Sequence, residues 1–169
     1  FDNPDNLKRI NLFAKYSGAV AENQMLSLQI SNFSSSWNAS GQIPEREVAA
    51  GRLSRFGSID NSEGGETSRL NANLTLSSRT AKGDYFSNQL FFSHYRFDLF
   101  SNFTFYKNDP GHGDEIEQQE DRNIYGYKGS FTAQRKIKRV SFTTEAGVQI
   151  RYDDIRNSSL SNVERRSIF

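Results

Sequence analysis

The 169-residue chain contains no cysteine, which excludes disulfide bonds, thiolate metal sites and cysteine nucleophiles. It also has no excess of either charge, since its formal net charge is +1 at pH 7. The net charge therefore provides no long-range electrostatic attraction for nucleic acid as a partner. The sequence has no run of about 18 apolar residues, so no transmembrane helix is expected. No signal peptide follows Phe1, and we interpret the sequence as a mature product or a fragment.

Hydrophobic residues are scarce, at 35 %, yet aromatic residues reach 13 %, with 14 Phe and 7 Tyr. The mean hydropathy is -0.72. A polar average with abundant rings is typical of a membrane β-barrel, whose lumen is wet and whose rims carry aromatic girdles. A soluble sandwich rich in Ser and Asn has a similar composition, so composition alone leaves both open.

A strict alternation of apolar and polar residues runs from Arg139 to Asp153. Even-numbered residues from Val140 to Tyr152 are mostly apolar, and the odd-numbered ones are polar. Side chains of a strand alternate between two faces, so this segment is predicted to be a two-faced β-strand. Further strands are predicted over 9–17, 25–35, 69–78, 85–106 and 123–134.

The connections between these strands alternate in length. Segments 18–23, 80–84 and 135–138 are short, whereas 37–68 and 107–122 are long. Outer-membrane barrels combine short periplasmic turns with long extracellular loops. Tilted strands of about 9–11 residues span a bilayer, whereas soluble strands cluster near 5–6 residues. We therefore predict an all-β fold: an antiparallel meander of about six long strands, part of a transmembrane β-barrel.

Three local features are also expected. A phase slip near Asn32-Phe33 predicts a β-bulge or the edge of the membrane. Segment 43–50 is compatible with one or two helical turns, with Pro44 at an early position. In the strand over 85–106, we expect one face toward lipid and His94, Arg96 and Asp98 toward the lumen. The residues predicted to face lipid are Phe91, Tyr95, Phe97, Leu99, Phe103 and Phe105.

Four segments resemble TonB-dependent outer-membrane receptors, chiefly those of Bacteroidetes-type bacteria. The most distinctive is loop 51–69, GRLSRFGSIDNSEGGETSR, preceded by SSWNASGQIPER at 35–46. The others are FDLFSNFTFY at 97–106 with Asn108-Asp109-Pro110, and RNIYGY at 122–127. From the first to the last, these segments span residues 35–127, more than half of the chain.

The resemblance implies a barrel of about 22 strands with a plugged lumen. It implies import of a nutrient such as a siderophore, vitamin or oligosaccharide across the outer membrane of a Gram-negative bacterium. On this interpretation residues 1–169 form a partial barrel domain without plug domain, TonB box or closing C-terminal strand. The implied partners are outer-membrane lipid, the rest of the barrel, the plug domain, the TonB complex acting through that plug, and the transported small ligand.

Candidate ligand-binding residues come from two places. The long loop carries Trp37, Arg52, Arg55 and Phe56, and Trp and Arg are frequent anchors in interfaces. Their alternative role is to cap the barrel mouth. His94, Arg96 and Asp98 are the second group, which would contact a ligand or the plug, or remain hydrated in the lumen.

No catalytic constellation is visible, and the chain is expected not to be an enzyme and to hold no cofactor. The sequence has no G-x-S-x-G motif and no HxH spacing for a metal. Oxygen-rich loops can bind Ca²⁺, but a solvated acidic loop is the simpler interpretation of segment 109–121. Its acidic residues are Asp109, Asp114, Glu115, Glu117, Glu120 and Asp121.

Two other function classes are weighed against the receptor. A secreted soluble β-sandwich, or an adhesin-like ligand-binding module, would use the apolar face of each strand to pack against a second sheet. A hydrolase on a β scaffold has no supporting set of residues.

Overall fold

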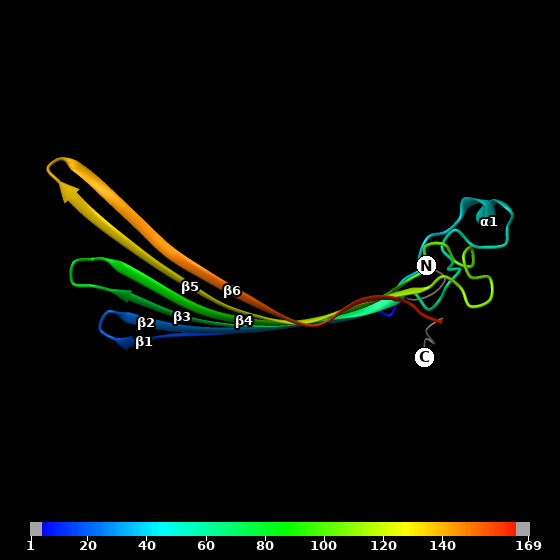
Figure 1. Cartoon of the computed structure of the whole chain (residues 1–169), viewed down its shortest axis with the longest axis horizontal. Coiled ribbons are helices and arrows are strands. Elements are labelled where there is room, and N and C mark those ends of the chain that lie inside the picture. Colours follow the sequence, from blue (N-terminus) through cyan, green and yellow to red (C-terminus); the bar gives the residue numbers. More distant parts are fainter. Residues whose placement is uncertain (1–4, 165–169) are drawn as a thin grey trace.

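The computed structural model describes residues 5–164, which form one open antiparallel sheet with its strands in sequence order. This confirms the predicted all-β meander (Figure 1). The strands are β1 (Lys8–Ala21), β2 (Gln24–Asn38), β3 (Gly64–Arg79), β4 (Tyr85–Ser101), β5 (Ile116–Ile137) and β6 (Val140–Asn162). Helix α1 (Glu45–Ala49) lies in the predicted 43–50 segment, with Pro44 as its N-cap. No helix in residues 5–164 is long and apolar enough to span a membrane.

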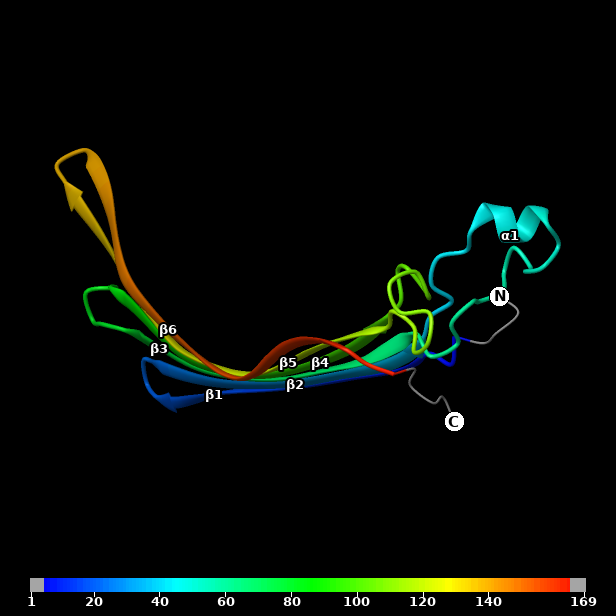
Figure 2. The same cartoon turned by 45° about the vertical axis from the view of Figure 1, so that its right-hand side comes forward.

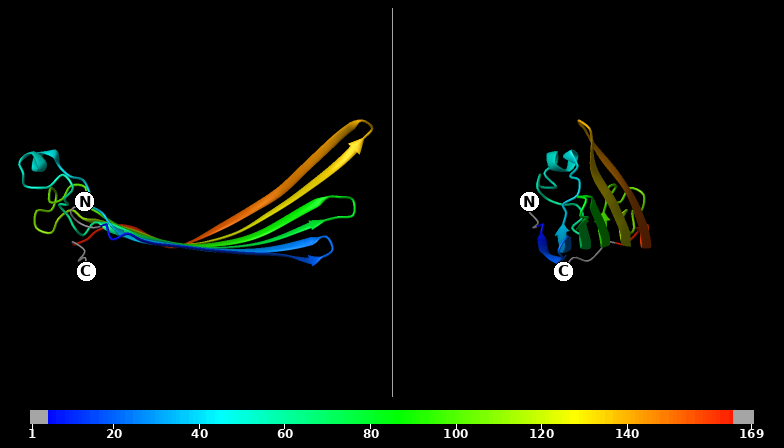
Figure 3. Two further views of the ribbon diagram at one scale, coloured as in Figure 1. Left: turned by 180° about the vertical axis from the view of Figure 1, so that it is seen from behind. Right: turned by 90° about the vertical axis from the view of Figure 1, so that its left-hand side faces the viewer.

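The two ends of the sheet differ. The three tight turns lie together at one end, the turn end, where the hairpins fan apart (Figure 1). The two long loops and α1 lie at the other, the loop end, and the sheet curves between them (Figure 2). Seen from behind and from its end, the sheet is a single layer (Figure 3). The short and long connections, which the sequence predicts to alternate, therefore lie at opposite ends of the sheet.

The strands are longer than the alternating pattern predicts, from 14 residues in β1 to 23 in β6. Most of the extra length lies at the loop end, where β3 begins at Gly64, β5 at Ile116, and β6 continues to Asn162. Both faces are polar there, so no alternation is visible in the sequence. Backbone pairing needs no apolar side chain and continues through these segments.

Strand β4 is the exception, because it ends at Ser101 and not at residue 106. Phe105 has a φ of 59°, which a strand does not allow. The Asn102 side-chain oxygen accepts the backbone N–H of Phe105 at 2.8 Å and stabilises a turn. Phe103 and Phe105 therefore lie in the second loop, and their predicted place in the strand is wrong.

The predicted bulge at Asn32-Phe33 is also wrong. Both residues continue the register with β1 and β3 without a shift. The register shifts instead between Ala19 and Ala21, and next to Asp121. At Asn32 the side chains of one face change from apolar to polar, but the register of the strand continues without a shift. This change in polarity alone gave the sequence the appearance of a phase slip.

The cross-strand register assigns every strand residue to one of two faces, because directly paired residues share a face. We call one the apolar face, after a row at its middle: Tyr16, Leu28, Leu74, Leu90, Tyr127 and Ile150. The other, the polar face, carries the row Ser17, Ser27, Thr75, Gln89, Lys128 and Gln149.

The register overturns the predicted faces of β4. His94 pairs with Leu70, so His94, Arg96 and Asp98 lie on the apolar face. Phe91, Tyr95, Phe97 and Leu99 lie on the polar face. The cause is a polarity change halfway along β4. On the apolar face, Phe86, Leu90 and Phe92 precede His94, so the face is apolar only near the turn end.

The sheet has almost no core of its own. Within residues 5–164, Ala133 is the one buried hydrophobic residue. Side chains of the apolar face are open instead, for example Tyr16 at 71 % and Ile150 at 62 % exposure. An apolar surface of this extent marks a contact with a partner or a membrane.

We predict that Gly126→Ala destabilises the β4–β5 pairing. The ring of Phe91, its cross-strand partner on the polar face, lies directly over Gly126 and occupies the space of an added methyl group. Overpacking of this kind costs about 1–3 kcal/mol. The thermal unfolding midpoint, followed by circular dichroism, should fall.

The control is Phe91→Ala combined with Gly126→Ala. With the ring removed, the added methyl group should cost little relative to Phe91→Ala alone. An equal loss in both backgrounds would show that the ring is not the obstacle.

Candidate functional site

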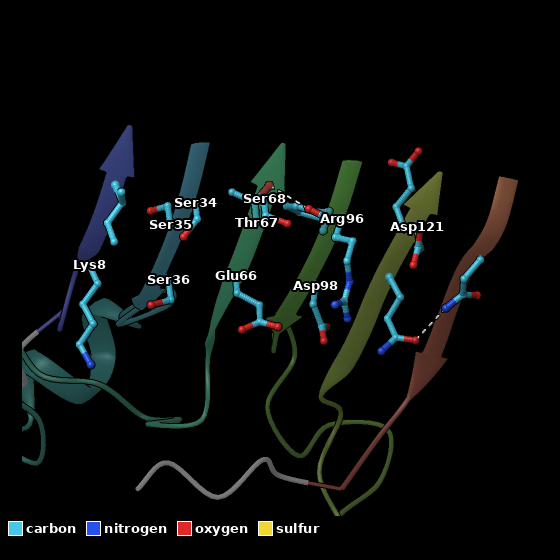
Figure 4. A pocket seen from close by; sticks show the side chains of 15 residues that line it. Lys8, Ser34, Ser35, Ser36, Glu66, Thr67, Ser68, Arg96, Asp98 and Asp121 are labelled. Atoms are coloured by element: carbon cyan, nitrogen blue, oxygen red, sulfur yellow. Dashed lines mark hydrogen bonds between the residues drawn. The ribbon is translucent and has the colours of Figure 1, made fainter. Parts of the chain in front are cut away.

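A groove of about 600 Å³ crosses the apolar face at the loop end (Figure 4). Its charged lining residues come from four strands and are Lys8, Glu66, Arg96, Asp98, Glu120 and Asp121. Ser34, Ser36 and Ser68 line it between the charges. The groove lies immediately beyond the apolar rows, because Ile10, Ser34, Ser68, Arg96 and Asp121 form one cross-strand row.

The charges of the groove are poorly matched within the chain. Lys8, Glu66, Arg96 and Asp98 take part in no ion pair within residues 5–164. One oxygen of Asp98 is shielded from solvent and has no hydrogen-bond partner in the described part of the chain, and Asp121 has a second such oxygen. Shielded carboxylate oxygens are costly unless a donor reaches them.

His94 lies one row below the groove, toward the turn end. Its Nδ1 is 2.9 Å from the side-chain amide of Asn123 and 3.8 Å from Asp121. Of the second predicted group, Arg96 and Asp98 thus line one groove, and His94 adjoins it.

The predicted loop residues do not join this groove. Trp37 lies in β2, on the polar face, where its ring covers Gly65. Arg52 forms a two-pronged pair with Glu47 of α1, at 2.7 and 3.0 Å, and this hydrogen bonding lowers the pKa of Glu47. Arg55 is exposed, and so is Phe56, at 57 %. The seven predicted residues therefore do not form one site.

A second arrangement, on the polar face, was not predicted. Phe33, Arg69, Tyr95 and Arg122 form one cross-strand row near the loop end. The guanidinium of Arg69 lies 4.8 Å from the Tyr95 ring centre, and that of Arg122 lies 5.8 Å from it. Arg9 lies 5.3 Å from the ring of Phe33. These are cation–π contacts, and we call this set the arginine–aromatic ladder.

A third arrangement joins the two long loops. We call it the loop junction: Asp60, Ser62, Glu63, Asn102 and Glu115. All five are more than nine-tenths buried, and Glu115 is fully buried. Polar groups at this depth are normally hydrogen-bonded, and the junction follows this rule almost throughout.

Hydrogen bonds connect the loops through this junction. Asn102 donates to Asp60 at 2.8 Å, and the Ser62 backbone N–H donates to Asp60 at 2.9 Å. The Ser62 hydroxyl contacts carboxylate oxygens of both Asp60 and Glu115, the latter at 2.8 Å. A hydroxyl has one proton to donate, so it can donate to only one of these two carboxylates at a time.

Glu63 completes the junction. Burial, together with the neighbouring charges of Asp60 and Glu115, raises its pKa from 4.5 to about 7. Its Oε1 has no hydrogen-bond partner within residues 5–164. Glu63 thus favours the neutral form, as expected for a carboxyl group held among others.

The predicted solvated acidic loop at 109–121 is not one structure. Glu117, Glu120 and Asp121 belong to β5, and Glu115 is in the loop junction. Asp109 accepts the backbone N–H groups of His112 and Gly111, which lower its pKa. Asp114 accepts the hydroxyl of Thr104 and backbone N–H groups of Asn108 and Asp109. Among the described residues, no group of three or more His, Cys, Asp or Glu is placed to hold a metal ion.

The sequence analysis did not identify the loop junction, because Asp, Asn, Ser and Glu are common residues in any loop. Asp60, Asn102 and Glu115 are more than forty positions apart at the extremes, and only folding brings them together. The partial signal was the resemblance itself, since segments 51–69 and 97–106 contain Asp60, Glu63 and Asn102.

The chain matches no family model, no curated protein and no solved structure.

We predict that the loop junction weakens as the pH rises from 4.5 to about 7. Over this interval Glu63 stays protonated in the folded chain but ionises in the unfolded one. The folded state then binds more protons, so its stability falls with rising pH. Trp37, the single Trp, precedes the first loop, and its fluorescence during heating reports the transition.

Glu63→Gln should remove this part of the pH dependence, because its side chain does not titrate. Glu47→Gln is the matched control on the exposed helix α1. A pH dependence identical in Glu63→Gln and the parent chain would contradict the assignment.

Proposed function

We propose that this chain is a section of the wall of an outer-membrane β-barrel, of the TonB-dependent receptor type, which imports a small nutrient. The apolar face would contact lipid and the polar face would line the lumen. The resemblance of four sequence segments supports the receptor type. The observation that carries the membrane assignment is the shape of the apolar area on the sheet.

The apolar area has a sharp limit toward the loop end. The continuous runs of apolar side chains on β2, β4, β5 and β6 end in one row, at Ile30, Phe92, Tyr125 and Tyr152. They extend further only on β3, to Leu70, and on β1, to Ile10. Beyond the limit lie Asn32, His94, Asn123 and Asp154.

Toward the turn end the apolar area continues to the turns themselves. The row that ends at the β1–β2 turn, with Gln24, crosses β5 at Phe131, and the longer β5–β6 hairpin continues the apolar face to Ile137 and Val140. The polar row at the loop end and the turns at the other end therefore bound an apolar band.

An open apolar band that ends at a polar border is what the lipid-facing wall of an outer-membrane barrel carries, because its outward side chains are apolar only within the hydrocarbon region.

The polar face suits a hydrated lumen. It carries a network of neutral side chains: Ser93 donates to Asn71 at 2.8 Å, Asn71 donates to Ser31 at 3.1 Å, and Gln89 donates to Asn73 at 3.2 Å. The arginine–aromatic ladder lies on the same face near the loop end, where an incoming ligand would pass. Residues of this face and end are therefore the best candidates for ligand contact.

The edges of the sheet indicate how the wall continues. Strands β1 and β6 each pair on one side only, so each exposes backbone donors and acceptors along its outer edge. A closed barrel satisfies these groups with further strands. The plug domain and the TonB complex belong to this proposal as partners of such a complete barrel.

A soluble sandwich or adhesin-like module is less well supported. A second sheet on the apolar face would also cover the groove and desolvate Arg96, Glu66 and Asp98. Burying unpaired charges is expensive. In the membrane arrangement these charges lie beyond the apolar band and remain hydrated.

Matched arginine substitutions test the two faces. Leu74 and Thr75 are neighbours in β3 on the apolar and polar faces. Leu74→Arg should destabilise the protein in a bilayer by about 2–4 kcal/mol, because a charge would face hydrocarbon. Thr75→Arg should have little effect, because its charge would face water. Folded yield in isolated outer membranes, read from heat-dependent mobility in gels, measures both.

Equal yields for the two variants would remove the basis for the lipid-facing assignment. A soluble, folded parent protein without detergent would have the same meaning.

Cysteine labelling tests the orientation, since the chain has no native cysteine. Ser54→Cys in the first long loop should react with a membrane-impermeant maleimide on intact cells. Lys82→Cys in the β3–β4 turn should react only after the outer membrane is permeabilised. The reverse pattern would place the loops on the periplasmic side.

A further inference from the structure

The hairpin of β5 and β6 extends past the neighbouring strand at the turn end. The last pair between β4 and β5 is Tyr85 with Thr132, whereas β5 and β6 stay paired for five more steps, from Ala133 to Ile137. In Figures 1 and 2 this hairpin leads away from the other two turns. We call residues 133–144 the hairpin tip. In the described part of the chain, no strand pairs with either outer edge of the tip.

The hairpin tip concentrates positive charge. Its sequence, AQRKIKRVSFTT, contains four basic residues and no acidic one. Arg135 is neutralised, because its guanidinium donates to both carboxylate oxygens of Asp84 in the β3–β4 turn. The other three, Lys136, Lys138 and Arg139, are exposed and form no ion pair with the described residues. The tip therefore presents three uncompensated positive charges.

Turn chemistry does not explain these charges. Lys138 and Arg139 form a two-residue connection between Ile137 and Val140, and Lys138 has a φ of 56°. Two-residue hairpin turns favour Asn-Gly or Asp-Gly, because these residues adopt positive φ more readily than others. This turn contains no glycine and places two long cationic side chains at the end of the hairpin. Their presence therefore indicates a contact outside the turn.

Apolar side chains accompany the charges. Ile137, Val140 and Phe142 belong to the apolar face and are 61 %, 55 % and 49 % exposed. They continue the apolar band into the tip, so the phase that covers the band also covers them. The uncompensated charges lie beside this surface, with Lys136 on the polar face and the other two in the turn. A matching partner therefore combines hydrocarbon with a negative charge.

We propose that the hairpin tip binds anionic phospholipid. The negative head group lies against Lys136, Lys138 and Arg139, and the acyl chains lie against Ile137 and Val140. An acidic protein segment would match the charges alone, whereas an anionic lipid matches both the charges and the apolar side chains. The site rests on the proposed membrane contact of the apolar face, and it adds a selectivity for lipid charge that this contact does not require.

Lipid retention tests the proposal. The protein is extracted from the outer membrane in a nonionic detergent and mixed with equal amounts of phosphatidylglycerol and phosphatidylethanolamine of identical acyl chains. Native mass spectrometry then gives the ratio of the two retained lipids. Each Lys or Arg beside an anionic surface strengthens the attraction about fivefold. Phosphatidylglycerol should therefore be preferred, and the triple variant Lys136→Gln, Lys138→Gln, Arg139→Gln should lower the ratio by about fivefold or more.

The matched control removes the same number of charges from exposed positions at the loop end. Its substitutions are Arg46→Gln, Arg55→Gln and Lys107→Gln, and the ratio should not change. A charge-conserving variant, with Lys136→Arg, Lys138→Arg and Arg139→Lys, should also keep the ratio, because the attraction depends on charge and not on side-chain shape.

Four results would each overturn the proposal. They are a ratio near one in the parent protein, an unchanged ratio in the glutamine variant of the tip, an equal fall in the loop-end control, and a fall in the charge-conserving variant. Heat-dependent mobility of each variant confirms that it is folded before its lipids are compared.

These outcomes are distinct from failure of the proposed function, which would appear as a tolerated Leu74→Arg. Because retention is measured in detergent, the result also does not depend on the side of the membrane at which the tip lies.

Discussion

The structure depends on one constraint: a single layer of strands has no second layer to cover its apolar side chains. Backbone pairing satisfies the donors and acceptors between the six strands, but it buries almost no side chain, and Ala133 alone is a buried hydrophobic residue in the described part. Hydrophobic stabilisation requires that apolar area be removed from water. The exposed rows around Leu28, Leu74 and Ile150 are therefore stabilised only when something outside the described sheet covers them.

The loops are held together by buried polar groups and not by apolar contacts. Where the sheet has little buried apolar surface, the loop end has buried carboxyl and amide groups, and Asp60, Asn102 and Glu115 connect the two long loops. Such a polar network is stable only when nearly all of its groups are satisfied. It fixes the loops relative to each other without a hydrophobic core, which leaves their outer surfaces free for contacts with other molecules.

The sequence predicted the number, order and pairing direction of the strands, because alternation is visible wherever one face is apolar. It predicted too little strand at the loop end, where Ile116 of β5 is followed by Glu117, Gln118 and Gln119 and both faces are mostly polar. It also misassigned β4, since the aromatic residues Phe91 and Phe97 suggested a lipid face that the pairing with β3 and β5 excludes. Only the register, set by two neighbouring strands, could resolve that.

The candidate sites were less accessible to sequence reasoning. Arg96 and Asp98 were singled out and do line one groove, but the partners that make it a groove, such as Lys8 and Glu66, come from other strands. The loop junction brings together residues from two loops, and no local spacing in the sequence indicates it. Contacts across strands and loops depend on register and on loop path, and neither is encoded in a short window of sequence.

The polarity change within β4 has a consequence for how such a chain can evolve. A single inserted residue within the strand would exchange its two faces beyond that point, placing Tyr95 where Arg96 lies and the charges where the rings lie. Two inserted residues would leave each side chain on its own face and shift only its position along the strand. Insertions and deletions should therefore collect in the long connections, and length changes within the strands should come in pairs.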